Sequence, residues 1–279
     1  MKVLWVKDNN IGHEKQVRVL LDELNKNVDL DIDERDVKGF YPLFTYLEDI
    51  EEKNYDFIIG AGHRTYSLIL SVKKNQKENT KSIAILSPTF HKDKFDIIFS
   101  PSHDKNKFKK TNNVIFFEGS LAKVSDKDTD ENTIMIAVGG KNKHFTFNED
   151  HIISQINYFI SIHPNKNCYI FNSRRTPSST NQKLVSLKNI YENVTFCDLN
   201  NGSNDFEKIL EKASSKLITR DSVNMIFESL SCRGKTYLID MKENRSSNKV
   251  VKIVNNLINN KEFVYKHCYK IVYVQYKIM

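Results

Sequence analysis

The chain has 279 residues, of which 39% are hydrophobic and 28% charged, and it carries a net charge of +7 at pH 7. This length suits one large domain or two ordinary ones, and no apolar run approaches the roughly 20 residues that span a bilayer. No signal peptide is visible, so we expect a cytoplasmic protein. The four cysteines lack metal-binding spacing, which argues against a structural zinc site and favours reduced thiols.

The first half of the chain alternates between predicted strands and helices. Apolar and β-branched runs predict strands at 2–6, 30–37, 55–59, 82–86, 95–99 and 114–117. Apolar residues at helical spacing predict helices around 17–24, over 41–52 and around 65–72. Such alternation is typical of an α/β domain with a parallel sheet.

The turn after the first strand contains Gly12 and His13. In an open α/β sheet this turn lies at the carboxyl ends of the strands, where ligands bind. His13 is therefore either a general base or an ordinary surface histidine. A second turn, 60–65, carries two glycines without dinucleotide-fingerprint spacing, and indicates a close backbone approach or plain turn chemistry.

The segment from Lys105 to Lys110 is locally basic. It is either a solvated loop or a contact with anionic lipid. Residues 125–132 are wholly polar and form the best linker candidate. They predict an N-terminal domain over 1–124 and a C-terminal domain over 133–279.

The second half repeats the alternation. Strands are predicted at 133–138, 168–171, 194–197, 216–219 and 236–241, and helices at 149–162, 182–191, 205–213 and 223–231. The tail, 263–279, mixes tyrosines with lysines and is a final strand or a helix returning to the first domain. We expect it to pack in a core rather than on a membrane.

Charged residues stand where strands of the second half end. Arg174 and Arg175 follow the strand 168–171, where they pair either with phosphate or with a neighbouring carboxylate. Asp221 or Ser222 is the predicted N-cap of the helix 223–231, whose free N–H groups suit a phosphate. Glu228, on the same side of that helix as Met225, is either a ribose ligand or a solvated residue.

The ordered motifs resemble the mitochondrial fission Elm-type family, whose bacterial members are regarded as GT-B-type glycosyltransferases. The resemblance runs from about residue 8 to residue 241. It is carried by Gly12-His13-Glu14-x-Gln16, Gly60-Ala61-Gly62-x-Arg64-Thr65, Ser102-His103-Asp104, Asn113-Val114, Gly119, Gly139-Gly140, Ser173-Arg174-Arg175-Thr176-Pro177 and Thr219-x-Asp221-Ser222-x-x-Met225-x-x-Glu228.

The resemblance implies an α/β, GT-B-like pair of Rossmann-like domains facing a cleft, with the C-terminal domain holding a nucleotide-sugar donor. It implies a donor site formed by Gly139, Gly140, Arg174, Arg175, Thr176, Asp221, Ser222, Met225 and Glu228, with His13 as the catalytic base. In that reading the arginines meet the donor phosphates, the 221–222 helix start holds the diphosphate and Glu228 binds ribose. The family's Asn-Pro-Tyr-like stretch is replaced here by Asn204-Asp205-Phe206, and Ser229 stands where alanine is usual.

Taken together, the residues and the resemblance predict a metal-independent glycosyltransferase. It would move a sugar from a nucleotide-sugar to a glycan or lipid-linked acceptor, as in cell envelope polysaccharide synthesis, without a cofactor. It would act in the cytoplasm, with peripheral contact to the anionic inner membrane face. The alternative is a catalytically inactive GT-B-like scaffold that recruits a protein partner to a membrane. Nucleic-acid binding is not favoured, because the basic residues form no compact patch with interleaved aromatics.

Overall fold

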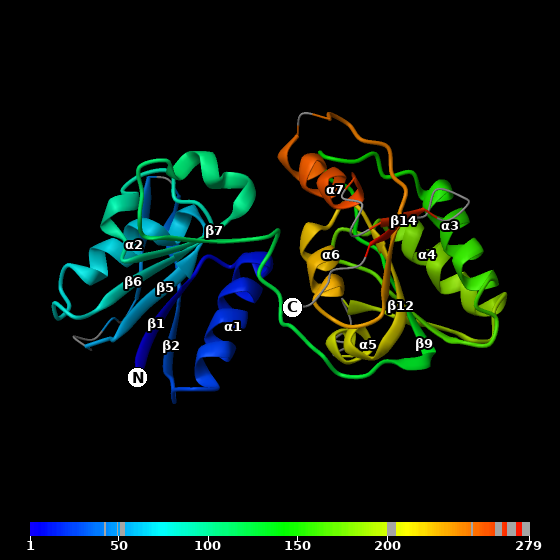
Figure 1. The fold of residues 1–279 in the computed structure, drawn as a ribbon, viewed down its shortest axis with the longest axis horizontal. Helices are drawn as coiled ribbons and strands as arrows, with labels where there is room; N and C mark the ends of the chain where they lie inside the picture. Colours follow the sequence, from blue (N-terminus) through cyan, green and yellow to red (C-terminus); the bar gives the residue numbers. More distant parts are fainter. Residues whose placement is uncertain are drawn as a thin grey trace. The chain divides into compact units, whose positions relative to one another are not determined.

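The computed structural model describes residues 1–41, 43–48, 50, 54–199, 205–246, 248–259, 264–266 and 272–274. The chain divides into two compact units, Met1–Ala122 and Lys123–Met279, each built on its own sheet (Figure 1). Acidic and basic residues balance in the first unit, so the whole net charge of +7 belongs to the second.

The first unit contains a parallel sheet in the order β2-β1-β5-β6-β7-β8. The strands are β1 (Lys2–Lys7), β2 (Asp31–Asp36), β5 (Phe57–Ala61), β6 (Lys81–Ile85), β7 (Ile97–Pro101) and β8 (Val114–Phe117). The helices are α1 (Ile11–Asn25) and α2 (His63–Lys73), with short 3₁₀ turns η1 (Lys92–Lys94) and η2 (Ser102–Phe108). The predicted strands of this half are confirmed, with shifts of a few residues at their ends.

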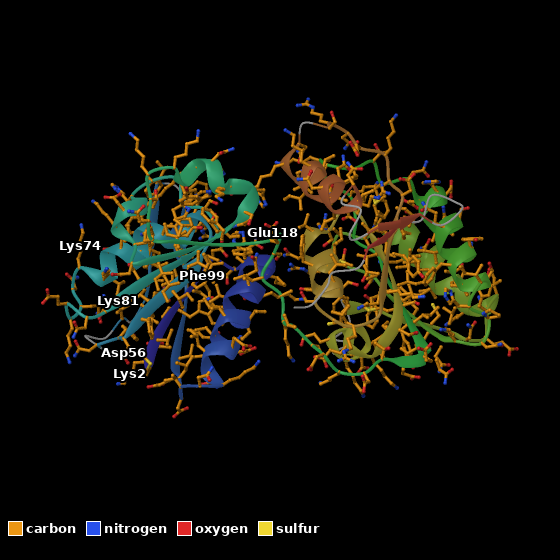
Figure 2. The ribbon with its side chains drawn as sticks, viewed as in Figure 1. Lys2, Asp56, Lys74, Lys81, Phe99 and Glu118 are labelled. Carbon is orange, nitrogen blue, oxygen red and sulfur yellow. The ribbon has the colours of Figure 1, made fainter. Side chains whose placement is uncertain are left out.

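Both faces of this sheet are covered. Along β1, Val3 and Trp5 pack with the buried residues of α1, while Leu4 and Val6 pack with those of α2. Successive side chains of a strand point to opposite faces, so a strand that is apolar throughout requires a helix on each side. At the amino ends of the strands, the Lys2 backbone N–H donates to Asp56 Oδ2 at 2.8 Å, which aligns the starts of neighbouring strands (Figure 2).

The helix predicted over 41–52 is wrong. The described part of this stretch forms a short hairpin instead, with β3 (Lys38–Phe40) antiparallel to β4 (Phe44–Tyr46). Phe40 is 75% exposed and Phe44 is 64% exposed. Gly39, in the middle of β3 with φ of +84°, and the nearby aromatic residues favour strand pairing over the helix that apolar spacing predicted.

The second unit contains a sheet in the order β11-β10-β9-β12-β13-β15-β14. The first five strands are parallel, β15 is antiparallel to β13, and β14 is antiparallel to β15. The strands are β9 (Asp130–Ala137), β10 (Asn167–Phe171), β11 (Val194–Cys197), β12 (Ala213–Thr219), β13 (Lys235–Ile239), β14 (Val264–Lys266) and β15 (Val272–Val274). The helices are α3 (Glu149–Ser161), α4 (Ser178–Ser186), α5 (Phe206–Lys212), α6 (Val223–Leu230) and α7 (Lys249–Asn259), with a 3₁₀ turn η3 (Leu187–Asn189).

In this unit the structure differs from the sequence prediction at the linker and at the tail. The polar stretch 125–132 includes the start of β9, because Asp130 pairs with Ala213 and its carboxylate accepts from Thr133 Oγ1 at 2.8 Å. The tail supplies the antiparallel strands β14 and β15 to the second unit's sheet, and the rest of 260–279 lies outside the described residues. Within the described ranges, no helix is long and apolar enough to cross a bilayer.

Candidate functional site

The site lies at the carboxyl ends of β9, β10 and β12 in the second unit. β9 is flanked by β10 on one side and β12 on the other, so the strand order reverses at β9. Open α/β sheets bind ligands at such reversals, just beyond the carboxyl ends of the strands. The loops that leave these three strands carry Gly139–Gly140, Arg174–Arg175 and Asp221–Ser222.

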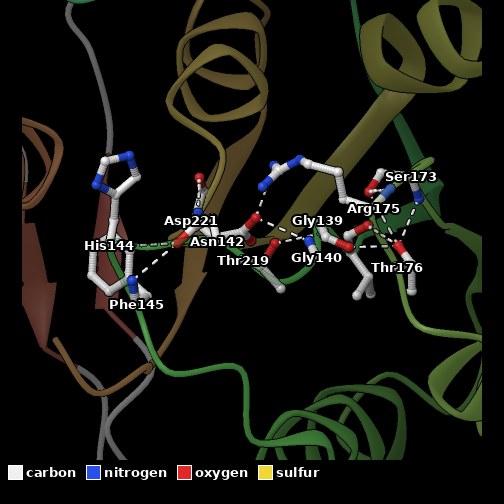
Figure 3. Close-up of polar contacts among 11 residues, drawn as sticks. Gly139, Gly140, Asn142, His144, Phe145, Ser173, Arg175, Thr176, Thr219 and Asp221 are labelled. Atoms are coloured by element: carbon white, nitrogen blue, oxygen red, sulfur yellow. Dashed lines mark hydrogen bonds and ion pairs between the residues drawn. The ribbon is translucent and has the colours of Figure 1, made fainter. Parts of the chain in front are cut away.

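Gly139 and Gly140 hold the loop after β9 against the other two strands. The Gly139 N–H donates to Thr219 Oγ1 at 2.7 Å, and the Gly140 N–H donates to Asp221 Oδ2 at 2.9 Å (Figure 3). A Cβ atom at position 139 would overlap the Asp221 carboxylate, and one at position 140 would overlap the backbone carbonyl of Arg175. The loop therefore requires glycine at both positions for close packing.

Asp221 is the centre of this network. The residue is only 5% exposed, and its Oδ2 accepts from Gly140 N–H and, at 3.0 Å, from Arg175 Nη2. Its backbone carbonyl accepts from Asn142 Nδ2 at 3.0 Å (Figure 3). Burial raises the pKa of the Asp221 carboxyl, although the Gly140 N–H and the Arg175 guanidinium favour the ionised form.

Of the two residues predicted as alternatives for the N-cap of α6, the structure selects Ser222 rather than Asp221. Ser222 is the N-cap of α6, and no side-chain hydrogen bond closes the start of that helix. Asp221 instead points inward to the glycine loop and Arg175. The first turn of α6 thus begins beside the loop, and the first backbone N–H groups of any helix have no partner within the helix.

The two arginines have different surroundings. Arg175 pairs with Asp221 at 3.0 Å, one of the two pairings that the sequence allowed, while its side chain stays 45% exposed. Arg174 is exposed, and the structure records no hydrogen bond or ion pair for it within the described ranges. Of the pair, Arg174 is the one whose guanidinium needs no rearrangement to meet an anion.

Thr176, Met225 and Glu228 complete the set predicted for this unit. Thr176 is buried, and its hydroxyl donates to the carbonyl groups of Val138 and Gly139, so it fixes the loop. Met225 and Glu228 are half-buried on α6, three residues apart. They therefore lie on one side of the helix that begins at the site.

Lys216 binds the C-terminal end of α6 through its ammonium group, a role that the sequence analysis missed. It is fully buried in β12, and its Nζ donates to the carbonyls of Ser229, Cys232 and Arg233 at 2.7, 3.2 and 2.7 Å. These carbonyls lie at the C-terminal end of α6, where helices leave acceptors unpaired. Burial lowers the pKa of Lys216 to about 8. Its strand mixes hydroxyl with apolar side chains, so no apolar pattern in the sequence marked this lysine as buried.

His13 lies in the first unit, in the first turn of α1. Its Nδ1 lies 2.7 Å from Oδ2 of Asp8, whose side chain is 7% exposed. Gly62, at φ of +91°, packs so closely that a Cβ there would lie 2.6 Å from His13 Nδ1. β1 and β5 also flank the reversal of strand order in this unit, so both residues stand at the carboxyl edge of the sheet, where open α/β sheets bind ligands. Sequence reasoning missed Asp8, although it ends the first strand five residues before His13.

The basic segment 105–110 is partly engaged within its own unit. Lys107 pairs with Asp104 at 2.9 Å, Lys105 lies over the Phe116 ring, and the Lys107 carbonyl accepts from Lys92. For metals, the part of the chain that the structure describes contains no group of three or more His, Cys, Asp or Glu residues able to hold an ion.

The family model for "Mitochondrial fission ELM1" matches residues 11–266. The chain belongs to this family. The family resemblance drawn from the motifs is thereby confirmed, and the loop residues of both units from Gly12 to Glu228 lie inside the matched range. A curated relative from Rickettsia prowazekii (strain Madrid E), named Uncharacterized protein RP120, is 26% identical over 272 residues, covering 80% of this chain and 76% of the relative.

Solved structures with this fold include three proteins whose titles name UDP or a UDP-GlcNAc 2-epimerase. The S. aureus MnaA-UDP structure has a TM-score of 0.52 at 12% identity, and the match covers 94% of this chain and 89% of the MnaA chain. The UDP-GlcNAc 2-epimerase from Neisseria meningitidis bound to UDP-GlcNAc has a TM-score of 0.52 at 13% identity, with coverage of 94% and 92%. A Listeria monocytogenes protein titled a UDP-N-acetylglucosamine 2-epimerase has a TM-score of 0.56 at 9% identity, with coverage of 91% and 81%. This member of the ELM1 family therefore has the GT-B-like α/β fold.

Proposed function

We propose that this ELM1-family protein is a metal-independent glycosyltransferase that moves a sugar from a nucleotide-sugar donor to a glycan or lipid-linked acceptor. One observation carries the proposal. Three loops from neighbouring parallel strands meet around Asp221, and they bring a tight glycine loop, two arginines and an uncapped helix start together. This is the combination that binds a diphosphate in α/β proteins.

The donor diphosphate would lie over the start of α6. Backbone N–H groups of the first turn donate to phosphate oxygens, and the helix dipole favours negative charge there. Arg174 adds a guanidinium with no competing partner among the described residues, and the net charge of +7 in this unit attracts the anion. Glu228 would accept from ribose hydroxyls. The solved structures with UDP or UDP-GlcNAc in their titles support this class of ligand.

These groups would also stabilise the leaving group. When the glycosidic bond to the nucleotide breaks, negative charge grows on the diphosphate. Fixed N–H groups and a guanidinium lower the energy of that charge without reorganising water, which is the main source of catalysis in such sites. A bound cation is not required for this step.

His13 would act as the base for the acceptor hydroxyl. With its Nδ1–H donated to Asp8, the lone pair of Nε2 is left free to accept a proton. Asp8 is buried, so it fixes both the tautomer and the ring orientation. Asp8 is thus a positioning residue in the proposed mechanism, and His13 the catalytic one.

Calorimetric titration of UDP, GDP and their sugar derivatives tests the proposal. Arg174→Ala should weaken nucleotide binding about tenfold, the typical loss for a charged hydrogen bond. Arg233→Ala is the matched control, because Arg233 is an exposed arginine of the same unit that pairs with Asp128, beyond the C-terminal end of α6. If wild type binds none of these nucleotides, or if both variants bind alike, the proposal fails.

A scaffold that recruits a partner to a membrane predicts a different pattern. Variants of His13 and Arg174 would then keep full function in cells, while charge reversal over Lys105–Lys110 would abolish it. The proposed transferase requires the reverse outcome in the same complementation assay.

A further inference from the structure

A second polar feature lies beside the site, on the other side of β12. It is a pocket of about 550 Å³ at the carboxyl ends of β12 and β13 and the start of α3. That volume lies within the range of small-molecule sites. Its polar lining includes His151, Arg220, Asp240 and Glu243, and its apolar lining includes Ile152 and Met241.

The charged groups of this pocket are held in place. Arg220 is only 8% exposed, and its Nη1 donates to Asp240 Oδ1 at 2.8 Å. The backbone of Asp240 is fixed on both sides by the buried Gln155, whose Oε1 accepts from the Asp240 N–H at 2.7 Å and whose Nε2 donates to its carbonyl at 3.0 Å. Asn255 donates to Glu243 at 2.8 Å. Such fixed groups need little ordering when a ligand binds.

The chemistry of the lining selects a neutral, hydroxyl-rich ligand. A second phosphate or another anion would meet the carboxylates of Asp240 and Glu243, and a cation would meet Arg220 and Lys242. A hydrocarbon would leave buried polar groups without partners. Sugar hydroxyls both donate and accept, so they suit a lining that offers carboxylates and N–H groups together, and Ile152 and Met241 suit the C–H face of a sugar ring.

The position of the pocket connects it to the diphosphate site. Arg220 is followed directly by Asp221 and Ser222, the residues at the start of α6. We infer that this pocket receives the glycosyl group of the donor, with Asp240 and Glu243 accepting from its hydroxyls and Arg220 donating to them. This inference rests on the proposed function, because it takes the diphosphate to lie over Ser222.

The test compares each nucleoside diphosphate with its sugar derivative by calorimetry. The probes are UDP, UDP-GlcNAc, UDP-glucose, GDP and GDP-mannose. For at least one sugar derivative, Asp240→Asn should lower the affinity about tenfold while the affinity for the parent diphosphate stays within about twofold, since one charged hydrogen bond to the sugar is weakened. Glu243→Gln should act in the same direction, and it provides the test if Asp240→Asn does not fold.

Asp150→Asn is the matched control. Asp150 lies in the first turn of α3, its side chain is 90% exposed, and it pairs with Lys183 outside the pocket lining. If wild type binds the diphosphates but neither Asp240→Asn nor Glu243→Gln affects any sugar derivative selectively, the pocket assignment is overturned and the diphosphate site stands. If wild type binds none of the probes, both the proposed function and the pocket assignment are wrong.

Discussion

The Arg175 guanidinium lies 3.0 Å from the carboxylate of Asp221, and this ion pair joins the loop after β10 to the loop after β12. The same Asp221 oxygen accepts from the Gly140 N–H, so three strand ends depend on one buried carboxylate. Breaking a buried network of this kind leaves its remaining members without partners.

We expect Asp221→Ala to lower the free energy of unfolding by about 1–3 kcal/mol, because the Gly140 N–H loses its acceptor in a buried setting. The lost ion pair with Arg175 lowers the free energy of unfolding little further, since the Arg175 side chain is 45% exposed and water can replace Asp221 as its partner. Asp221→Asn keeps one acceptor oxygen and should cost less. Urea unfolding of the three proteins measures the difference, and equal stabilities of wild type and Asp221→Ala would contradict the role assigned to this residue.

A glycine stands against a carboxylate at the carboxyl edge of the sheet in each unit. Gly139 touches Asp221 in the second unit, and Gly62 touches Asp8 in the first. Gly62→Ala should disturb the Asp8–His13 pair, because the added methyl group would overlap both side chains and φ is positive there. We expect a loss of about 1–3 kcal/mol in unfolding free energy, as for overpacking in other cores. Unchanged stability and an unchanged His13 NMR signal would contradict this packing.

The Asp8–His13 pair makes a prediction about rate. Asp8→Asn should reduce kcat by about 10² or more with little change in KM, because an asparagine amide can donate to Nδ1 and leave the proton on Nε2. Transfer of sugar from the donor to an acceptor extract gives the rates, and Asp150→Asn is the control. An unaltered kcat in Asp8→Asn would remove Asp8 from the mechanism. A loss confined to KM would assign it to binding.

Lys216 predicts a dependence of stability on pH. Its pKa is about 8 in the folded chain and near 10.5 when unfolded, so the folded state loses its proton first. Below pH 8 the lysine is charged in both states and the cost of burying the charge is fully present; above 10.5 it is neutral in both. Wild type should therefore gain up to about 3 kcal/mol of stability between pH 8 and 10.5, because each pH unit between the two pKa values contributes roughly 1.4 kcal/mol.

Lys216→Met provides the comparison for that window. The variant lacks the titrating amine, so its stability should not rise in this way, and other titrating groups cancel in the difference between the two proteins. The variant should also be less stable at high pH, because three carbonyls at the end of α6 lose their donor. Parallel curves for the two proteins across pH 8 to 10.5 would show that Lys216 does not lose its proton there.

Because the hairpin is exposed, we expect substitutions in it to change the stability of the protein much less than substitutions in the core. Phe44 is 64% exposed, so Phe44→Ser should change the free energy of unfolding by no more than about 0.5 kcal/mol. Phe159→Ser, at a residue only 1% exposed in α3, should cost about 3 kcal/mol or more. Similar losses for the two variants would mean that the hairpin is packed in solution.

The alternating pattern of apolar runs was enough to predict the parallel strands of both sheets, because strands buried on both faces, such as 134–137, have few polar residues. It misassigned 41–52, where apolar residues at helical spacing predicted a helix and the described part forms a hairpin with β3. Arg174, Arg175, Asp221 and Ser222 were predicted from their place after strands, whereas Gly139, Gly140 and Thr176 came from the family resemblance. The sequence did not predict that Asp221 turns inward and pairs with Arg175. Spacing alone does not tell whether Asp221 or the neighbouring Ser222 caps the helix. Lys216 and Asp240 act through contacts 13 or more residues away in sequence, and no local pattern indicates them. Asp8 stands only five residues before His13, and its pairing was missed.

The central claim is that a nucleoside diphosphate binds over Gly139–Gly140, Arg174 and the start of α6. Amide hydrogen exchange, followed by mass spectrometry with and without saturating UDP or GDP, tests it most directly. We predict slower exchange in peptides covering 139–142, 173–176 and 222–226, with none in the peptide covering 235–239 at the core of the same sheet. Unchanged exchange in all three segments, or protection confined to other parts of the chain, would contradict the account.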